Sequence, residues 1–202
     1  MNSKYNLIEL TVSDFEVYMK EVVIAHQKLK AKNALTEKPV YVGKNNHTYN
    51  IEHRLLFIEN INFNLKKPEL TFNHLKRLWH ALVKNAVSEI ETNAFLTWLI
   101  KSKETSSRQK TYCIGDTLLK QVFSNILCNP QMMDNFTNIN IEIFKCFEKF
   151  FEIINEKEEY LDISKNNSYR VHKFDHLIGV EIIWQMLLVC TDEKVSVVMF
   201  SQ

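Results

Sequence analysis

The stretch INIEIFKCFEKFFEII at residues 139–154 decides the fold class of this chain. Its apolar positions recur at steps of three and four, and four of them are phenylalanine. This spacing places them on one face of an α-helix, whereas a half-buried strand would alternate every second residue. The stretch therefore predicts an amphipathic helix that buries an aromatic stripe.

The composition of the whole chain favours helices in the same way. Of its 202 residues, only Gly 3 and Pro 3 are of the two turn-forming types, about a quarter of their average share. Sandwiches and barrels need these residues at tight turns, and nucleotide-binding α/β folds need glycines against phosphate. The 46% hydrophobic and 24% charged residues are ordinary for a globular protein. We therefore expect an all-α fold.

Sequence signals for helix starts occur at several places. Ser13 with Glu16 and Ser88 with Glu91 have the spacing of a capping box, and Thr71 is a further N-cap candidate. Together with helical periodicity, these signals predict about seven to eight helices. The expected ranges are 14–32, 51–67, 72–84, 89–100, 116–129, 139–154, 175–188 and 192–202.

Polar loops are expected between these helices. Pro68 and Pro130 end the helices before them, because the residue preceding a proline is pushed out of α geometry. Residues 33–50 are expected to form a long loop that contains an extended segment at 40–42. A polar run follows at 101–110, and the charged stretch 155–167 is a third expected loop.

Two of the expected helices have similar sequences. Residues 75–83 and 180–188 align on Trp79 and Trp184, which lie 105 residues apart. Each is followed, after a short polar break, by another apolar helix, as in the stacked antiparallel helix pairs of HEAT and armadillo solenoids. With repeats of about 40–47 residues, this distance fits two or three units with insertions. The alternative is an irregular bundle in which each tryptophan fills a core.

A solenoid buries the apolar face of each helix against its neighbours. Phe147, Phe150, Leu177 and Trp184 are therefore expected in the core, and replacing Trp184 by alanine is expected to cost about 3–5 kcal/mol.

One helical-repeat segment is expected over residues 1–202. It would comprise an N-terminal helix and loop over 1–47 and stacked helix pairs over 48–202. The apolar helix expected at 192–202 runs to the last residue, which predicts that the chain is a fragment of a longer protein.

The cysteines carry no recognisable redox or zinc motif. Cys113, Cys128, Cys146 and Cys190 lie far apart without a Cys-x-x-Cys pair, and we interpret them as small buried hydrophobic residues. The N-terminus leads into a charged amphipathic segment rather than a signal peptide. The most apolar run, 177–190, is too short to cross a bilayer. These features predict a cytoplasmic setting and no membrane partner.

One histidine pair resembles a metal site at first sight. His172 and His176 stand four residues apart with Asp175 between them, and on one helical face they could hold zinc. The expected helix begins near Asp175, however, so the two rings need not share a face. We interpret them as histidines of a loop and a first turn. Three other histidines stand beside apolar positions and are interpreted as packing residues: His53, His74 and His80.

No catalytic, cofactor-binding or metal-binding residue is assigned from motifs. A glycine-rich phosphate loop, a Gly-x-Ser-x-Gly elbow and a His-Glu-x-x-His pair are all missing from the sequence. No cofactor is therefore expected.

Basic and aromatic residues interleave in one region, as in some nucleic-acid-binding proteins. They are Lys66, Lys67, Lys76, Arg77 and Lys84 among Phe63, Phe72 and Trp79. The 25 Lys and Arg are nevertheless balanced by 24 Asp and Glu, and the net charge is +1. We therefore interpret this region, like the charged stretch 148–159, as a solvated helix face and expect no nucleic-acid partner.

Three spaced segments carry a family resemblance: FKCFEKFFEIIN at 144–155, DHLIGVEIIW at 175–184 and DEKV at 192–195. They resemble the long helical region of fat-facets-type ubiquitin carboxyl-terminal hydrolases, a group of ubiquitin-specific proteases. Upstream, YNIEHRLLF at 49–57 and LWHALV at 78–83 are similar to preceding repeats of that region. The resemblance covers residues 48–200.

This resemblance implies a parent enzyme that removes ubiquitin from protein substrates by thiol-dependent isopeptide hydrolysis. The family's cysteine and histidine boxes have no counterpart here, because Thr111-Tyr112-Cys113 reverses the expected order and lacks the preceding glycine and asparagine. The implied role is a monomeric, non-catalytic scaffold segment that contacts ubiquitinated substrates or the rest of the enzyme. Two alternatives remain: a free-standing helical adaptor unrelated to ubiquitin, and a small metal-dependent helical enzyme using His172 and His176.

Overall fold

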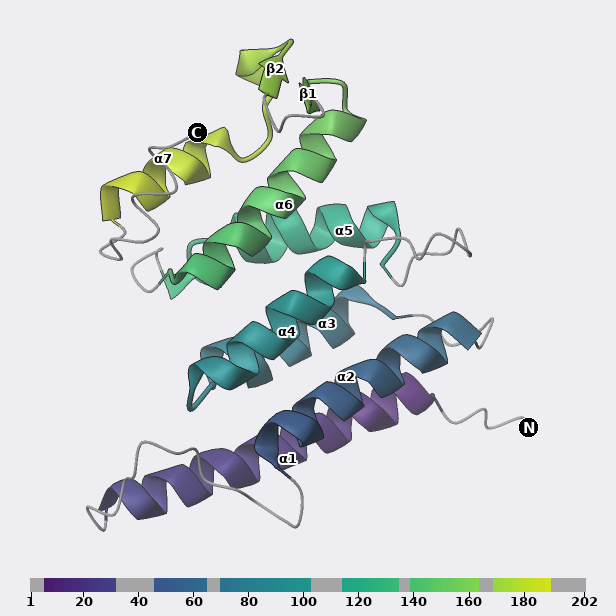
Figure 1. Cartoon of the computed structure of the whole chain (residues 1–202), viewed down its shortest axis with the longest axis vertical. Helices are drawn as coiled ribbons and strands as arrows, with labels where there is room; N and C mark the ends of the chain where they lie inside the picture. The colour runs from purple at the N-terminus through teal and green to yellow at the C-terminus, as the bar shows by residue number, and fades with distance from the viewer. Residues whose placement is uncertain are drawn as a thin grey trace. The chain divides into compact units, whose positions relative to one another are not determined.

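The computed structural model describes residues 6–31, 46–64, 70–102, 114–134, 139–163 and 169–189, which form helices and one short hairpin (Figure 1). The chain divides into two compact units, Met1–Gly115 and Asp116–Gln202. Among the described helices, none has both the length and the apolar character needed to cross a membrane. The expectation of an all-α, solenoid-type fold is confirmed.

The first unit consists of two helix pairs. Helices α1 (Leu7–Ala31) and α2 (His47–Asn64) are antiparallel, as are α3 (Phe72–Trp79), extended by the π-helical turn η1 (His80–Lys84), and α4 (Glu89–Lys101). Helix α1 packs on α3, and α2 packs on α4. First helices therefore contact first helices and second helices contact second helices, which is the stacking of a helical-repeat solenoid.

Helix starts in this unit partly follow the sequence signals. Thr71 caps α3, since its side chain accepts a hydrogen bond from the His74 main chain. Ser88 precedes α4, and its main-chain N–H donates to Glu91 at 3.0 Å, as a capping box requires. The prediction for Ser13 is wrong. Helix α1 begins six residues earlier, where the Asn6 side chain accepts from the Glu9 main chain at 3.2 Å.

The second helix also begins before its predicted start. Helix α2 opens at His47 and not at Ile51, because the Asn46 side chain accepts the main-chain N–H of Thr48 at 2.9 Å and so caps the first turn. The expected extended segment 40–42 lies outside the described residues, as does the polar run from 103 onward.

The second unit is built on one helix pair. Helix α5 (Asp116–Val122) continues into the π-helical turn η2 (Phe123–Leu127) and is followed by α6 (Ile141–Lys157). The aromatic stripe of α6 is buried as predicted, with Phe147 and Phe150 fully enclosed. The Asn140 side chain caps α6 by accepting from the Ile143 main chain at 2.9 Å.

The stretch 155–167, predicted as a loop, contains the end of α6 and the first strand of a short β-hairpin. Strand β1 (Leu161–Ile163) pairs antiparallel with β2 (Tyr169–Val171). Asn155, predicted to start the loop, is instead a buried residue of α6. Its side chain donates to the Ile178 carbonyl at 3.0 Å and accepts from the Ile178 N–H at 2.7 Å. It therefore fixes the turn that leads into the last helix.

The last described helix, α7 (Val180–Val189), begins later than predicted. Asp175 lies in a short 3-10 turn, Phe174–His176, and not at a helix start. Gly179 adopts φ +92°, and a Cβ there would lie 2.7 Å from the Phe123 ring. Since this conformation strains any other residue, Gly179 sets the start of α7. The helix predicted over 192–202 lies outside the described residues.

The prediction that Trp184 belongs to the core is wrong, because its side chain is 59% exposed. Phe147, Phe150 and Leu177 are buried as expected. Trp79, with which Trp184 was aligned, is 1% exposed. The similarity of 75–83 to 180–188 therefore does not reflect equivalent positions in the fold.

The structure identifies a different internal repeat. Residues 75–83 (LKRLWHALV) and 119–127 (LKQVFSNIL) lie 44 residues apart, within the range of armadillo and HEAT repeats. Both segments enter a π-helical turn, closed by the main-chain bonds Asn85 N to His80 O at 3.0 Å and Cys128 N to Phe123 O at 2.8 Å. The two segments therefore share both sequence pattern and backbone geometry.

Each of these repeats leads into a similar row of aromatic rings. In the first unit Trp79 meets Phe95 edge-on at 6.3 Å between ring centroids, and Phe95 stacks on Trp98 at 5.9 Å. In the second, Phe123 meets Phe147 at 5.2 Å, and Phe147 stacks on Phe151 at 6.3 Å. In both units a ring of the first helix thus contacts a ring of the second helix, which stacks on a further ring of that helix.

Candidate docking surface of the N-terminal unit

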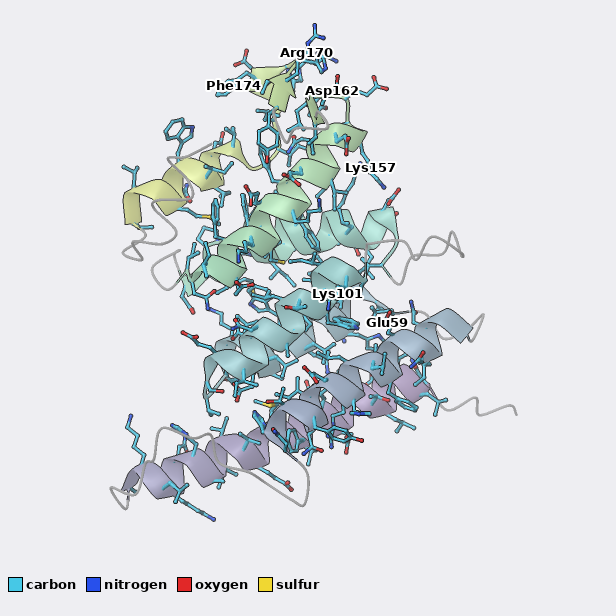
Figure 2. All side chains as sticks on the ribbon, viewed as in Figure 1. Glu59, Lys101, Lys157, Asp162, Arg170 and Phe174 are labelled. Atoms are coloured by element: carbon cyan, nitrogen blue, oxygen red, sulfur yellow. The ribbon has the colours of Figure 1, made fainter. Side chains whose placement is uncertain are left out.

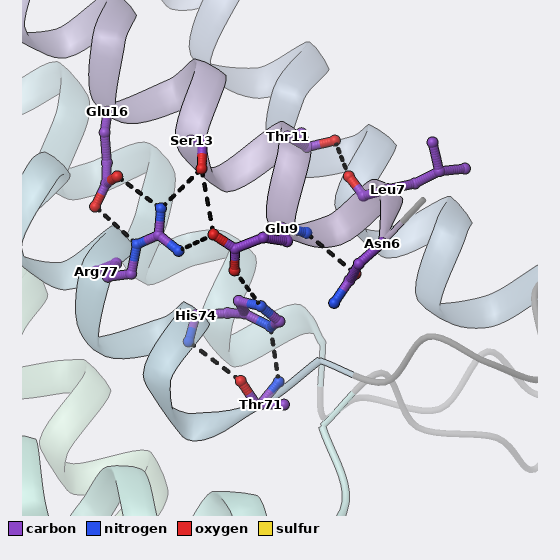
Figure 3. A network of polar contacts seen from close by, with 9 residues as sticks. All are labelled: Asn6, Leu7, Glu9, Thr11, Ser13, Glu16, Thr71, His74 and Arg77. Atoms are coloured by element: carbon purple, nitrogen blue, oxygen red, sulfur yellow. Dashed lines mark hydrogen bonds and ion pairs between the residues drawn. The ribbon is translucent and has the colours of Figure 1, made fainter. Parts of the chain in front are cut away.

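Arg77 links α3 to α1 through a cluster of charged side chains (Figure 3). Its guanidinium donates to both carboxylate oxygens of Glu16, at 2.7 and 2.9 Å, and to Glu9 at 2.5 Å. It also donates to Ser13 Oγ at 3.0 Å. These hydrogen bonds from Arg77 lower the pKa of both Glu9 and Glu16, and the carboxylates raise the pKa of Arg77. The cluster holds α1 in register on α3.

This cluster changes the interpretation of the basic region. Arg77 is not part of a solvated face, because its side chain is 23% exposed and paired with two carboxylates. Lys76 is exposed as predicted. The side chains of Phe63, Lys66 and Lys67 lie outside the described part.

A buried polar network joins three helices on the other side of the unit. The Tyr18 hydroxyl lies 2.6 Å from His47 Nδ1, and His47 Nε2 lies 2.9 Å from Glu91 Oε1. Ser88 donates to the second carboxylate oxygen through its main-chain N–H and its hydroxyl. A neutral ring with its proton on Nε2 satisfies both contacts, by donating to Glu91 and accepting from Tyr18.

Burial governs the electrostatics of this network. The side chains of His47 and Glu91 are both fully enclosed. Burial by itself would raise the pKa of Glu91, but the hydrogen bonds from His47 and Ser88 outweigh it and lower that pKa. Burial raises the pKa of Tyr18. The network therefore forms a largely buried junction between α1, α2 and α4.

The outer side of α1 and α2 carries an exposed apolar surface, here called the α1–α2 face. It is formed by Leu7, Leu10, His53, Arg54 and Phe57 around a hollow of about 450 Å³. Leu10 and Phe57 are each 52% exposed. Apolar side chains at such exposure, with a paired charge beside them, are typical of protein-interaction surfaces.

The charged pair of this face is held in place. Arg54 Nε donates to Asp14 at 2.8 Å, and the guanidinium lies 4.5 Å from the centre of the Tyr18 ring. Val17 and Ile24 continue the apolar line along α1 at seven-residue steps from Leu10, and both are half exposed. The surface therefore runs along most of the outer side of α1.

The described cysteines are unsuited to nucleophilic catalysis. Burial raises the pKa of Cys128 to about 12 and raises that of the fully enclosed Cys146. A thiol reacts as its thiolate, and neither residue forms one at neutral pH. Cys146 is buried, as the sequence predicted, whereas Cys128 is only partly buried. Cys113 and Cys190 lie outside the described residues.

The side chains of His172 and His176 contact different residues. His172 Nε2 lies 2.7 Å from Asp162, whereas the His176 ring lies against Tyr160 at 5.7 Å. In the described ranges no three metal-ligating side chains form a group. His74 is buried, lies 3.0 Å from Glu9 and accepts from the Thr71 main chain, as expected of a packing residue. The same interpretation is wrong for His53 and His80, which are exposed.

The exposed face and the buried network of this unit were not predicted from the sequence. No sequence pattern had assigned a contact or a role to His47, Leu10 or Phe57. Seven-residue spacing of Leu10, Val17 and Ile24, outside the buried stripe of α1, was the available signal for the exposed face.

The chain is similar in sequence to short parts of proteins named as ubiquitin carboxyl-terminal hydrolases. The sequence model of the family described as "UBP24/USP9X/USP9Y ARM repeat" matches residues 1–155. "Probable ubiquitin carboxyl-terminal hydrolase FAF" of Drosophila melanogaster is 25% identical over 201 residues, 97% of this chain and 7% of its own length. "Ubiquitin carboxyl-terminal hydrolase 9Y" of Homo sapiens is 25% identical over 200 residues, 96% of this chain and 7% of its own.

A further relative covers less of the chain. "Ubiquitin carboxyl-terminal hydrolase 9X" of Mus musculus is 26% identical over 151 residues, 73% of this chain and 5% of its own length. The chain thus spans only a small part, about 7%, of the first two relatives. No solved structure matches the chain.

Proposed function

The chain belongs to the UBP24/USP9X/USP9Y ARM-repeat family, and on that premise we propose that it is a non-catalytic scaffold segment of a fat-facets-type deubiquitinase. In this role it docks ubiquitinated substrates or other parts of the parent enzyme. The parent removes ubiquitin by thiol-dependent hydrolysis in the cytoplasm. This segment provides a binding surface and no catalytic residue. It acts as a monomeric part of the longer chain.

Two observations carry the proposal: the family match and the α1–α2 face. Leu10 and Phe57 are half exposed on this face. A helical-repeat unit with such a face is suited to bind other proteins, because burying apolar side chains drives most protein association. The ion pair of Arg54 with Asp14 at the edge of this face favours one orientation of a bound partner.

The non-catalytic part of the proposal is supported by the cysteines. Cys146 is buried and Cys128 is partly buried, and the raised pKa values of both disfavour a thiolate. The family's cysteine box is missing from the whole sequence.

The two other functions considered from the sequence lose support. A free-standing adaptor unrelated to ubiquitin fits poorly with relatives that are all named as ubiquitin hydrolases. A metal-dependent enzyme would need His172 and His176 on one site, but His172 faces Asp162 and His176 faces Tyr160.

The test is made in the parent protein. The reading frame that contains this chain is sequenced, and we expect it to encode a cysteine-protease box. In that protein Phe57→Asp should leave hydrolysis of a fluorogenic ubiquitin amide unchanged and slow the removal of ubiquitin from protein substrates. Leu188→Asp, an equally polar change at an exposed site of the second unit, is the control. Equal rates for Phe57→Asp and the unchanged enzyme on protein substrates would contradict docking at this face.

A further inference from the structure

A groove between α2 and α4, of about 600 Å³, lies within the first unit and is distinct from the α1–α2 face. Its apolar lining includes Leu55 and Leu56 of α2 and Ile90 and Ala94 of α4. Polar side chains stand along both of its edges. It therefore combines a hydrophobic base with a polar rim, the usual make-up of a site for a peptide.

Two hydrogen-bonding atoms of this groove have no partner. They are Trp98 Nε1, a donor, and Asn93 Oδ1, an acceptor. In the described part of the chain these are the only shielded side-chain polar atoms of this kind, and both belong to the groove lining. Buried polar groups are almost always hydrogen-bonded, so each such atom calls for an explanation.

The Trp98 side chain is held firmly. It is 6% exposed and stacks on Phe95, which fixes the indole ring and so the direction of its N–H. Asn93 lies five residues earlier on α4. One donor and one acceptor at fixed positions match a peptide main chain, because each peptide unit offers one C=O and one N–H.

The charges of the groove identify the kind of peptide. Glu52 and Glu59 lie seven residues apart on α2, hence on one side of the helix and about 10 Å apart along its axis. Neither makes an ion pair with any residue that the structure describes. Lys101 of α4 stands near Glu59 at one end of the groove, as Figure 2 shows. The carboxylate of Glu52 at the other end has no such counter-charge and favours a cation.

We propose that the α2–α4 groove binds an extended peptide segment of a partner protein, with a basic side chain on Glu52 and the main chain on Trp98 Nε1 and Asn93 Oδ1. Apolar side chains of the peptide contact Leu55 and Leu56. The proposal rests on the docking role given above and names the chemistry of one partner. Since the two unpaired atoms are shielded in the unbound chain, binding requires the side chains that cover them to move aside.

The probe is a short fluorescein-labelled peptide of alternating lysine and leucine, titrated with the full chain and followed by fluorescence anisotropy. The indole N–H signals of the three tryptophans are followed in parallel by ¹H–¹⁵N NMR. Binding should move the Trp98 signal, which is assigned by its loss in Trp98→Phe. That variant keeps an aromatic ring beside Phe95, removes the N–H donor and shortens the side chain.

Three changes should weaken binding. Glu52→Gln should weaken it about tenfold by removing a charged contact. The matched control Glu21→Gln, at an exposed site of α1, should change it by no more than about twofold. Trp98→Phe should weaken it about fivefold. A peptide with N-methylated central amides should also bind more weakly, because it cannot donate to Asn93.

Three results would overturn the proposal. They are no binding of the lysine–leucine peptide, equal binding of a glutamate–leucine peptide, and equal weakening by Glu52→Gln and Glu21→Gln. Each would leave the scaffold role in place, because that role is contradicted only by the enzyme assays. The experiments therefore distinguish failure of the peptide-binding proposal from failure of the proposed scaffold function.

Discussion

Trp79 and Trp184 occupy similar sequence contexts and opposite environments. Both stand inside apolar helical stretches, yet Trp79 is 1% exposed and Trp184 is 59% exposed. Trp79 lies against Phe95 of the neighbouring helix. The position equivalent to Trp79 in the second unit is Phe123, which also contacts a phenylalanine of the next helix, Phe147, in a tilted arrangement. Equivalent positions in the two repeats are therefore recognised by an aromatic ring that contacts a ring of the next helix, and not by the presence of tryptophan.

A second difference concerns how helices are joined. In the first unit, charged and polar clusters join the helices of different pairs: Arg77 with Glu9 and Glu16, and His47 with Glu91. In the second unit, ion pairs of Lys120 with Glu158 and of Lys157 with Asp116 lie within one helix pair, beside the phenylalanines of that pair. Asn155 fixes a turn. Charged junctions specify register between helix pairs, whereas apolar contacts supply most of the stability.

The largest effect is expected for Trp79→Ala. It removes a fully buried indole from the aromatic row and should lower the free energy of unfolding by about 3–5 kcal/mol. Urea denaturation of the full chain, followed by circular dichroism, measures this change. A loss as small as that of Trp184→Ala would show that Trp79 is not the core residue of the repeat.

The next effect tests the buried junction of the first unit. Glu91→Ala leaves His47 and Ser88 without their acceptor and should cost about 2–4 kcal/mol. Glu89→Ala, two residues earlier in the exposed first turn of α4, is the matched control and should cost less than about 1 kcal/mol. The same denaturation measurement applies. Similar losses for the two variants would contradict the buried network.

A smaller effect is expected for Arg77→Met. The side chain is partly exposed, so the loss of its hydrogen bonds to Glu9, Glu16 and Ser13 should cost about 1–2 kcal/mol. Lys76→Met, at the exposed neighbouring position, should cost less than about 0.5 kcal/mol.

The pH dependence of the same variant sharpens this test. Glu9 and Glu16 have lowered pKa values in the folded chain because of Arg77. Their stabilisation is present above the unfolded pKa of about 4.3 and is lost as pH falls through the lower folded value. The difference between the unchanged chain and Arg77→Met should therefore shrink below about pH 4. A difference that stays constant with pH would assign the effect to packing instead.

The smallest effect is expected for Trp184→Ala. Because the side chain is largely exposed, the free energy of unfolding should change by no more than about 0.5 kcal/mol. The emission of Trp184 in a variant with phenylalanine at the other two tryptophan positions should be readily quenched by iodide. If iodide did not quench Trp184 and Trp184→Ala lowered the free energy of unfolding by several kcal/mol, Trp184 would be a core residue.

Local features of this fold could be read from the sequence. The stripe of α6 and the caps at Thr71 and Ser88 depend on residues within one or two helical turns of each other, so periodicity and cap spacing were sufficient. The all-α class followed from the scarcity of glycine and proline.

Features that depend on distant partners could not be read in this way. His47 meets Glu91 across 44 residues, and no local pattern links them. The strands LDI and YRV are three residues long, too short for an alternating pattern to stand out from a charged loop. The pattern around Trp184 shows an apolar helix but not whether another element covers it. The groove between α2 and α4 is likewise a property of helix packing.

Turnover of a fluorogenic ubiquitin C-terminal amide by the purified chain, before and after thiol alkylation, is the most direct test that this segment docks proteins and does not catalyse. We predict no turnover above the rate of the substrate alone in a sample that is folded and helical by circular dichroism. Turnover that alkylation abolishes would contradict the scaffold role and would direct the search for a nucleophile to the four cysteines.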